Sequence, residues 1–382
     1  MAKERKLFEE VGAAPVQTAQ VGVIAARSGA RRGLRLWLSV LFLLIACMIA
    51  VGGMTRLTDS GLSITEWKPV TGAIPPLNDA DWAVEFGKYQ ASPEFKLQNS
   101  QMTISAFKSI FWWEWGHRQL GRVIGLVWAV GFFGFLLARR VPLGWRGRLL
   151  GIGGLIGLQG AIGWWMVSSG LAGAMVDVAS YRLATHLGLA FVILGLIAHY
   201  VFLLGRSEVD LIAARRAGER KLAGMATGLM HFTFLQILLG ALVAGIDAGT
   251  AFPTWPDMNG QFFPADAFYV PSGGAIWHAF FENAGLVQFM HRMSGYLLAA
   301  FAVVVWLRGR KSAYAATRLA FHTVMVLIVV QITLGILTAL SAAQVHLAIS
   351  HQITAVILWV LIIRARYLAF APVAGSLQGG KL

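Results

Sequence analysis

Eight long apolar runs dominate the chain. They cover approximately residues 34–54, 117–137, 148–167, 181–204, 224–246, 286–306, 318–340 and 346–366. Runs of about 20 apolar residues match the roughly 30 Å hydrocarbon core of a bilayer. Because a backbone in lipid must satisfy its own hydrogen bonds, each run is expected to be an α-helix. The predicted fold class is therefore an all-α polytopic membrane protein with eight transmembrane helices.

The composition agrees with this fold class. Of the 382 residues, 57% are hydrophobic and only 13% are charged, which is more apolar surface than a soluble domain of this size needs. The net charge of +14 raises the alternative of a nucleic-acid-binding protein. The distribution of the charge decides between the two.

The basic residues gather on one side of the predicted membrane. If the N-terminus is cytoplasmic and the sides alternate, most of the 32 Lys and Arg fall in cytoplasmic segments, in the clusters "RSGARRGLR", "ARRVPLGWRGR", "ARRAGERK" and "RGRKSAYAATR". This is the positive-inside bias of a membrane protein. Both termini are therefore expected in the cytoplasm, the bilayer is the expected partner, and no nucleic acid is expected. The first apolar run is too long for a cleavable signal peptide.

The loop lengths predict two halves. The two longest connections, 55–116 and 247–285, follow the first and fifth runs on the outer side. A four-helix unit used twice explains this spacing. The predicted organisation is a cytoplasmic tail (1–33), an N-terminal half (34–204), a cytoplasmic linker (205–223), a C-terminal half (224–366) and a cytoplasmic tail (367–382).

Three pairs of short segments support the repeat. "HRQLGR" (117–122) matches "HRMSGY" (291–296), "LQGAIGWWMVSSG" (158–170) matches "VQITLGILTALSA" (330–342), and "ATHLGLA" (184–190) matches "ISHQITA" (349–355). Each half has an even number of spans, so the halves are expected to be parallel four-helix bundles related by an axis along the membrane normal.

Four of the nine histidines occupy matching places in the repeat, all on even-numbered spans: His117, His186, His291 and His351. Each is expected about one turn from the outer end of its span, roughly 5–8 Å deep. Two facing imidazoles in an apolar bundle are the axial-ligand arrangement of a six-coordinate haem. The alternative for a single membrane histidine is packing, but repetition at four equivalent positions favours two haem sites, one in each half.

Other metal sites fit the sequence less well. A zinc site would need further ligands nearby, usually carboxylates or thiols. The one cysteine, Cys47, excludes a disulfide within the chain and is expected to pack inside its span. The remaining histidines break the repeat and are interpreted as structural, with His278 and His346 as reserve ligands.

Glu114 distinguishes the two halves. It lies three residues before His117, on the same helical face, whereas Gln288 holds the same offset from His291. If one haem is chemically altered and the other only passes electrons, the acid marks the reactive site. The alternative is an acid favoured by the dipole at a helix N-terminus.

Arginines and tryptophans lie close to these histidines. Arg118 and Arg292 each follow a candidate ligand, so they are predicted to pair with haem propionates; lipid headgroups are the alternative partners. Five tryptophans gather at the outer edge, at positions 112, 113, 115, 164 and 165. They are expected to form an interfacial belt, with some lining a haem pocket.

The stretch "GGMTRLTDSGLSITEWKPVTGAIPPL" (52–77), the motif "EWGHRQLGR" (114–122) and the four-histidine repeat resemble the haem A synthase family. The resemblance covers about residues 34–366. It implies that the four histidines are haem ligands, that Glu114 is the functional acid, and that haem b is bound in the C-terminal half. The N-terminal half would hold haem O, the substrate, whose methyl group is oxidised to a formyl group through hydroxylated intermediates to give haem A.

The resemblance also implies a setting. The first outer loop lacks the cysteine pair of one subclass, so the chain resembles the cysteine-free branch found in mitochondria and many proteobacteria. Expected partners are haem O synthase, cytochrome oxidase assembly factors and an electron-transfer partner; a homo-oligomer is left open. The expected location is a bacterial inner membrane, with the haem sites near the periplasmic side.

Two other functions remain alternatives. A bis-histidine cytochrome b that shuttles electrons would explain the four histidines, but not the difference between Glu114 and Gln288. A two-fold pseudo-symmetric transporter would have unwound spans broken near the midplane. The ionisable residues here lie instead at the outer edge of the spans.

Overall fold

The computed structural model describes residues 18–171, 173, 175–270 and 272–373. In this part of the chain, eight helices are long and apolar enough to cross a membrane, and no strand is present. The eight predicted spans are confirmed as α1 (Thr18–Leu57, apolar from Gly29), α4 (Ile104–Leu137), α5 (Arg146–Gly170), α6 (Ser180–Leu204), α8 (Arg220–Gly245), α11 (Ala284–Gly309), α12 (Ala315–Leu340) and α13 (Val345–Phe370). Most of the predicted tails 1–33 and 367–382 lies outside the described residues or in helix ends.

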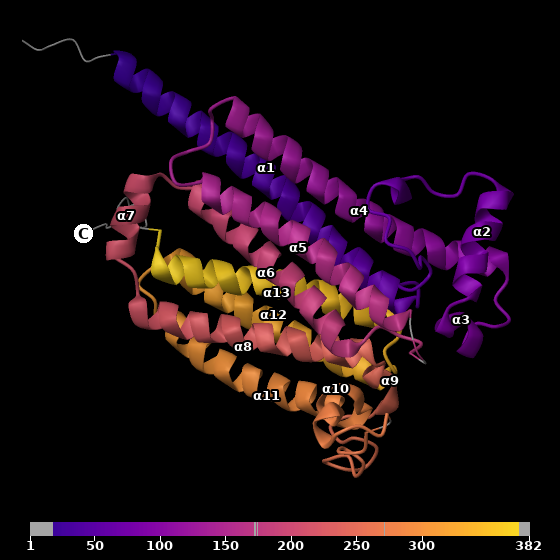
Figure 1. The fold of residues 1–382 in the computed structure, drawn as a ribbon. Helices are drawn as coiled ribbons and strands as arrows, with labels where there is room; N and C mark the ends of the chain where they lie inside the picture. The colour runs from indigo at the N-terminus through magenta and orange to yellow at the C-terminus, as the bar shows by residue number, and fades with distance from the viewer. Residues whose placement is uncertain (1–17, 172, 174, 271, 374–382) are drawn as a thin grey trace, which may run out of the picture.

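Short helices fill the connections. Three follow α1: η1 (Thr71–Ala73), α2 (Asp79–Gln90) and α3 (Pro93–Leu97). The connection after α6 holds α7 (Glu208–Arg216), and the connection after α8 holds α9 (Ala248–Ala251), η2 (Ile276–His278) and α10 (Ala279–Glu282). In Figure 1, α2, α3, α9 and α10 lie at one end of the long helices and α7 lies at the other. Both long connections therefore cap the same end.

The eight long helices form two rings of neighbours. In the first ring α1 contacts α4 and α6, and α5 contacts the same two helices. In the second ring α8 contacts α11 and α13, and α12 contacts the same two. Helices α6 and α13 also pack on each other between the rings, and each is half-buried. This is the neighbour pattern that two equivalent halves would give; their symmetry stays a prediction.

Tryptophans dock into glycine gaps to join neighbouring helices. Trp37 of α1 donates its indole N–H to the carbonyl of Val127 at 3.0 Å, and a Cβ at Gly131 would lie 2.0 Å from that indole. Trp128 repeats the arrangement one helix further on, with the Leu149 carbonyl at 3.0 Å and the missing Cβ at Gly153. Glycine is required at these crossings because a side chain would overlap the indole ring.

The start of α4 differs from the prediction. The second span was expected to begin at residue 117, but α4 begins at Ile104, where the side chain of Thr103 accepts a hydrogen bond from the amide of Ala106. An aromatic cluster (Trp82, Tyr89, Phe107 and Phe111) buries the extra turns against α2. An apolar run predicts only the length of helix that a bilayer needs, whereas packing against the outer connection extends α4 beyond that length.

The outer connection contains a buried carboxyl group. Glu94 of α3 is 3% exposed, and its Oε2 has no hydrogen-bond partner among the described residues. Burial, with repulsion from Asp177, Asp59 and Glu114, raises the pKa of Glu94 from 4.5 to about 8. Since the unfolded carboxyl ionises first, the free energy of unfolding should fall as the pH rises between these two values and then level off.

Replacing Glu94 by glutamine should therefore remove this pH dependence. Glu94→Gln should raise the thermal midpoint at about pH 8 and leave it nearly unchanged at about pH 4, with a limiting gain in the free energy of unfolding on the order of 5 kcal/mol. Thermal unfolding of the detergent-solubilised protein at several pH values measures this. Parallel midpoint-against-pH curves for the variant and the unchanged protein would contradict the assignment.

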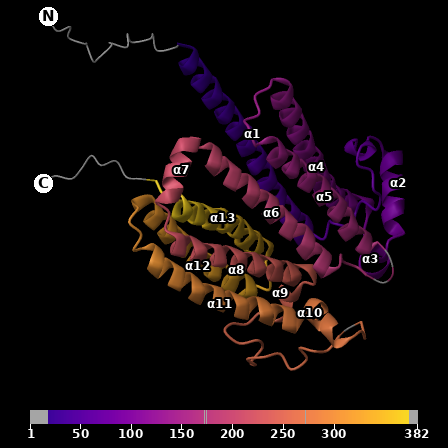
Figure 2. The same cartoon turned by 60° about the vertical axis from the view of Figure 1, so that its left-hand side comes forward.

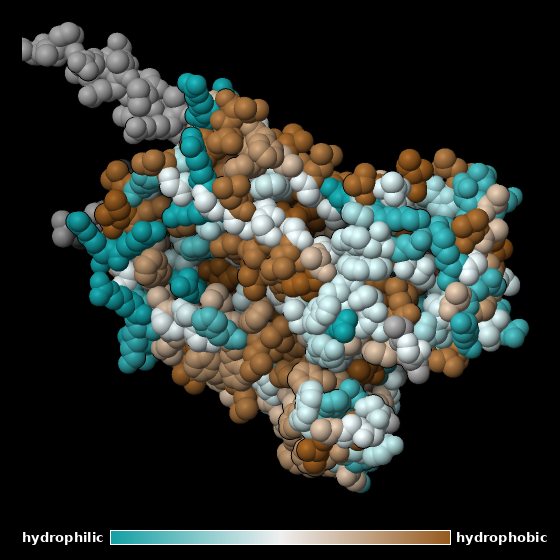
Figure 3. Space-filling view, viewed as in Figure 1, coloured by the Kyte–Doolittle hydropathy of each residue, from teal (hydrophilic) through white to brown (hydrophobic). Residues whose placement is uncertain are grey.

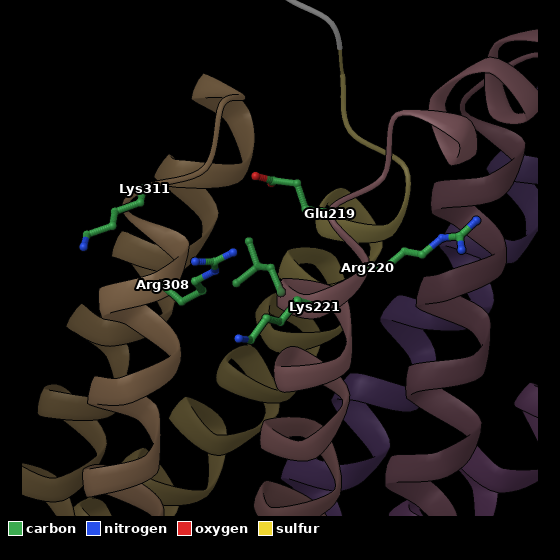
Figure 4. Close-up of a pocket in the computed structure, with 6 residues that line it drawn as sticks. Glu219, Arg220, Lys221, Arg308 and Lys311 are labelled. Carbon is green, nitrogen blue, oxygen red and sulfur yellow. The ribbon is translucent and has the colours of Figure 1, made fainter.

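Hydrophilic residues gather at the two ends of the molecule (Figure 3). In Figure 3, hydrophobic residues cover much of the middle of the molecule and hydrophilic residues gather towards its two ends. At the end that carries α7, a cavity of about 300 Å³ opens between α8 and α11 (Figure 4), lined by Glu219, Arg220, Lys221, Leu222, Arg308 and Lys311. The net positive lining suits the end that the sequence predicts to be cytoplasmic.

Reporter fusions test this orientation. Fusions after Gln90 and after Ala265 should report an outer location, and a fusion after Ile212 of α7 should report the cytoplasm. The expected signals follow from the positive-inside bias and from the placement of the two long connections at one end. A cytoplasmic signal at Gln90 or Ala265 would overturn the orientation, and with it the predicted periplasmic position of the histidines.

Candidate functional site

The four candidate ligands lie on four different long helices. His117 is on α4, His186 on α6, His291 on α11 and His351 on α13. The helices that carry them stand opposite one another in each ring, because α4 and α6 both contact α1 and α5, and α11 and α13 both contact α8 and α12. Each ring of helices therefore supplies two imidazoles.

The depth of about one turn from the outer end of each span stays a prediction, because a helix end need not coincide with the membrane boundary. His186, His291 and His351 lie about two turns from the outer ends of their helices, and His117 lies almost four turns into α4. The difference at His117 comes from the extra turns that pack on α2. The distance from the helix end therefore differs between His117 and the other three histidines.

Each imidazole packs against a glycine on the preceding long helix. A Cβ at Gly163, Gly240 or Gly335 would lie 2.9, 3.1 or 3.0 Å from the Cε1 atom of His186, His291 or His351, respectively. A Cβ at Gly52 would lie 3.1 Å from Nε2 of His117. The missing side chains leave room for the rings between the helices.

Three glutamines contact three of these histidines. Gln159, Gln236 and Gln331 each donate an amide hydrogen from Nε2 to the backbone carbonyl of the histidine, at 3.0, 2.9 and 3.1 Å respectively. The same nitrogen lies within 3.3 Å of a ring nitrogen in every case. The glutamines were not predicted from the sequence, although "LQGAIG", "LQILLG" and "VQITLG" repeat one spacing of glutamine and glycine.

Glu114 is deeply buried, and both of its carboxylate oxygens have hydrogen-bond partners. It is 2% exposed and its Oε2 accepts hydrogen bonds from the Ser63 hydroxyl at 2.7 Å and the Ile64 amide at 2.6 Å. Its Oε1 forms an ion pair with Arg118, with the guanidinium nitrogens at 2.5 and 3.0 Å. The carboxylate thus joins the face of α4 that carries His117 to the connection after α1.

The helix-dipole explanation of Glu114 is wrong. Glu114 lies about three turns into α4, and the first turn of that helix contains no acidic residue. The counterpart Gln288 is also buried, and its Oε1 has no hydrogen-bond partner among the described residues. The two rings of helices therefore differ in charge at two buried positions that have the same offset from a histidine.

Both candidate propionate partners hold outer connections. Arg118 donates to the carbonyls of Glu66 and Ile64 at 2.8 and 2.6 Å. Arg292 donates to the carbonyls of Asp257 and Phe252 at 2.9 and 2.8 Å. Each arginine thus fixes the connection that follows α1 or α8 beside a candidate ligand. Propionate binding by either arginine stays a prediction.

The other candidates lie away from these contacts. His278 in η2 forms a 3.4 Å contact with Glu282, and His346 is exposed. Cys47 is exposed on the outward side of α1, so the expectation that it packs inside is wrong. Trp112, Trp113 and Trp165 are also exposed, as expected for an interfacial belt.

Three aspartates from three separate connections lie close together. Asp59, Asp177 and Asp247 are the one group of three metal-ligating side chains found among the described residues. Arg56 takes the central place, with nitrogen–oxygen distances of 2.8, 3.6 and 2.6 Å to the three carboxylates. The negative charge of the three aspartates is therefore balanced by a guanidinium group. The four histidines are not part of any such group of metal-ligating side chains among the described residues.

Comparisons with known proteins identify the family. The model of the cytochrome oxidase assembly protein family COX15-CtaA matches residues 35–363. The heme A synthase of Roseobacter denitrificans is 61% identical over 99% of this chain and 100% of the relative. The heme A synthases of Cereibacter sphaeroides and Ruegeria sp. are each 60% identical, over 100% and 98% of this chain and 99% of each relative. The chain therefore belongs to the COX15-CtaA family of cytochrome oxidase assembly proteins, together with these heme A synthases.

Proposed function

We propose that the protein is an oxidoreductase that converts haem O to haem A for a terminal cytochrome oxidase. The methyl group of haem O that becomes a formyl group would be oxidised through hydroxylated intermediates. One observation carries the proposal: two pairs of imidazoles stand on opposed helices, with a buried acid beside only one pair, in a chain about 60% identical to heme A synthases. The acid marks the N-terminal half as the reactive half.

The residues present fit a haem in each half. The donor set is imidazole without thiolate, as in bis-histidine haem proteins. An iron-bound imidazole usually donates its other N–H to a nearby acceptor. Each of Gln159, Gln236 and Gln331 has a buried amide oxygen without a partner among the described residues, so each can supply that acceptor after a small rotation.

The protein's own residues would bind and orient the two haems and would hold or move a proton. His117 and His186 would hold the haem being converted, and His291 and His351 would hold haem b. The haem supplies the redox chemistry when bound. Glu114 would hold or release a proton at its carboxylate beside the substrate, while Arg118 and Arg292 would hold the outer connections beside the two sites.

The alternatives explain less of the structure. A transporter predicts spans unwound near the midplane, whereas each of the eight described spans is one continuous helix. A cytochrome b that only shuttles electrons gives no role to a buried acid beside one pair of histidines. The proposal places both haems near the periplasmic side of a bacterial inner membrane, with haem O synthase, oxidase assembly factors and an electron-transfer protein as partners.

Pigment extraction tests the proposal. Haem should be extracted from the purified protein and separated by reversed-phase chromatography. Haem O or haem A together with haem b is the expected result. Haem b alone would support the electron-transfer alternative, and a preparation without haem from a haem-producing host would contradict haem binding altogether.

A further inference from the structure

Three of the four helices that carry a histidine-facing glycine also carry a glutamine at a fixed spacing, and α1 does not. On α5, α8 and α12 a glutamine precedes the histidine-facing glycine by four residues, so both lie on one helical face. On α1 the same place, four residues before Gly52, is taken by Met48. The repeat thus has one position where an amide is replaced by a thioether.

The glutamines hold both the backbone and the ring of their histidines. Gln236 shows this most clearly, since its Nε2 lies 2.9 Å from the backbone carbonyl of His291 and 3.0 Å from Nδ1 of the ring. An imidazole that binds iron through Nε2 would carry its hydrogen on Nδ1 and would donate it to the unpartnered amide oxygen of the glutamine. That ring could not rotate about its side-chain torsions without losing a hydrogen bond. Inside a low-dielectric bundle an unmade hydrogen bond is costly.

His117 lacks such a partner. A thioether has no hydrogen to donate, and Met48 packs instead against α4, where its Cε would lie 3.4 Å from a Cβ at Gly121. Glutamines contact the rings of His186, His291 and His351, whereas among the residues that the structure describes no hydrogen bond to the His117 ring is found. Of the four candidate ligands, His117 is therefore the least restrained.

We propose that Gln159, Gln236 and Gln331 are positioning residues that fix three ligands, and that Met48 leaves His117 as the exchangeable ligand. The inference rests on the proposed haem sites. Haem bound between two histidines would take up another molecule only if one of the two side chains could move aside. The unrestrained ligand lies in the same half as Glu114. The N-terminal half therefore has both departures from the repeat, Met48 in place of a glutamine and Glu114 in place of Gln288.

Carbon monoxide is the probe that tests this assignment. It binds ferrous haem only where a ligand can leave, and it is read from the reduced-plus-CO difference spectrum without turnover. The unchanged, haem-loaded protein should bind CO at one of its two haems. Met48→Gln supplies the missing amide and should slow CO binding about tenfold, the weight of one added hydrogen bond.

Replacing a glutamine of the C-terminal half by methionine is the reverse experiment. Gln236→Met should make the second haem reactive, so that CO binds at both. Gln352→Met is the matched control, since Gln352 adjoins His351 but donates instead to the Ile49 carbonyl at 2.7 Å; CO should still bind at one haem only. Met48→Leu should behave as the unchanged protein does.

Two results would overturn the inference while leaving the proposed function intact. One is an unchanged rate of CO binding in Met48→Gln with both haems present. The other is a C-terminal haem that stays unreactive in Gln236→Met. Absence of haem from all preparations would instead contradict the proposed function, so the two failures are distinguishable by pigment content.

Discussion

Replacing His291 by alanine should remove about one of two haems and leave the other in place. The reason is that α11 packs with α8, α12 and α13, whereas the helices that carry His117 and His186 belong to the other ring. The reduced-minus-oxidised spectrum, together with haem content per protein, measures this result. The haem that is lost should be haem b, and chromatography of the remaining pigment identifies it.

His346→Ala is the matched control for this experiment. His346 lies five residues before His351 on α13 and is exposed, so its removal should leave both haems bound. Equal loss of both haems in a folded His291→Ala protein would contradict separate sites. Loss of haem in His346→Ala would make that residue a ligand in place of one of the four.

Replacing Glu114 by glutamine should nearly abolish haem A while the protein keeps its haems. The substitution preserves the shape but removes the charge and the exchangeable proton. General acid–base groups contribute roughly 10²–10⁴-fold to rates, so haem A should fall at least about a hundredfold, with accumulation of haem O or a hydroxylated intermediate. Chromatography of haems from cells that carry the variant as their only copy, normalised to protein level, is the measurement.

The structure supplies a competing explanation that needs its own controls. Glu114 also anchors the connection after α1 through Ser63 and balances Arg118. Ser63→Ala removes one of these hydrogen bonds and keeps the charge, so it should cost stability of about 1 kcal/mol and retain haem A. Glu94→Gln makes the same chemical change at another buried acid. Near-normal haem A in Glu114→Gln would mean that Glu114 only holds the connection after α1 and has no role in the reaction.

The comparison of Glu114 with Gln288 shows how far a sequence repeat can be interpreted. The offset of each residue from a histidine is a local property, because helical spacing fixes which residues share a face. The partners of the carboxylate are not local, since Ser63 and Ile64 come from a connection about fifty residues away. The difference between the halves was therefore predictable, whereas its ion pair with the outer connection was not.

The sequence alone determined the eight spans and the four repeated histidines. A helix in lipid needs only its own backbone hydrogen bonds and enough apolar residues, both of which are properties of a short segment. The tertiary structure decided where α4 begins, which carbonyls Arg118 and Arg292 hold, and that glutamines contact three of the four histidines. Those features depend on contacts between segments far apart in the chain, whose distances are set only when the helices pack.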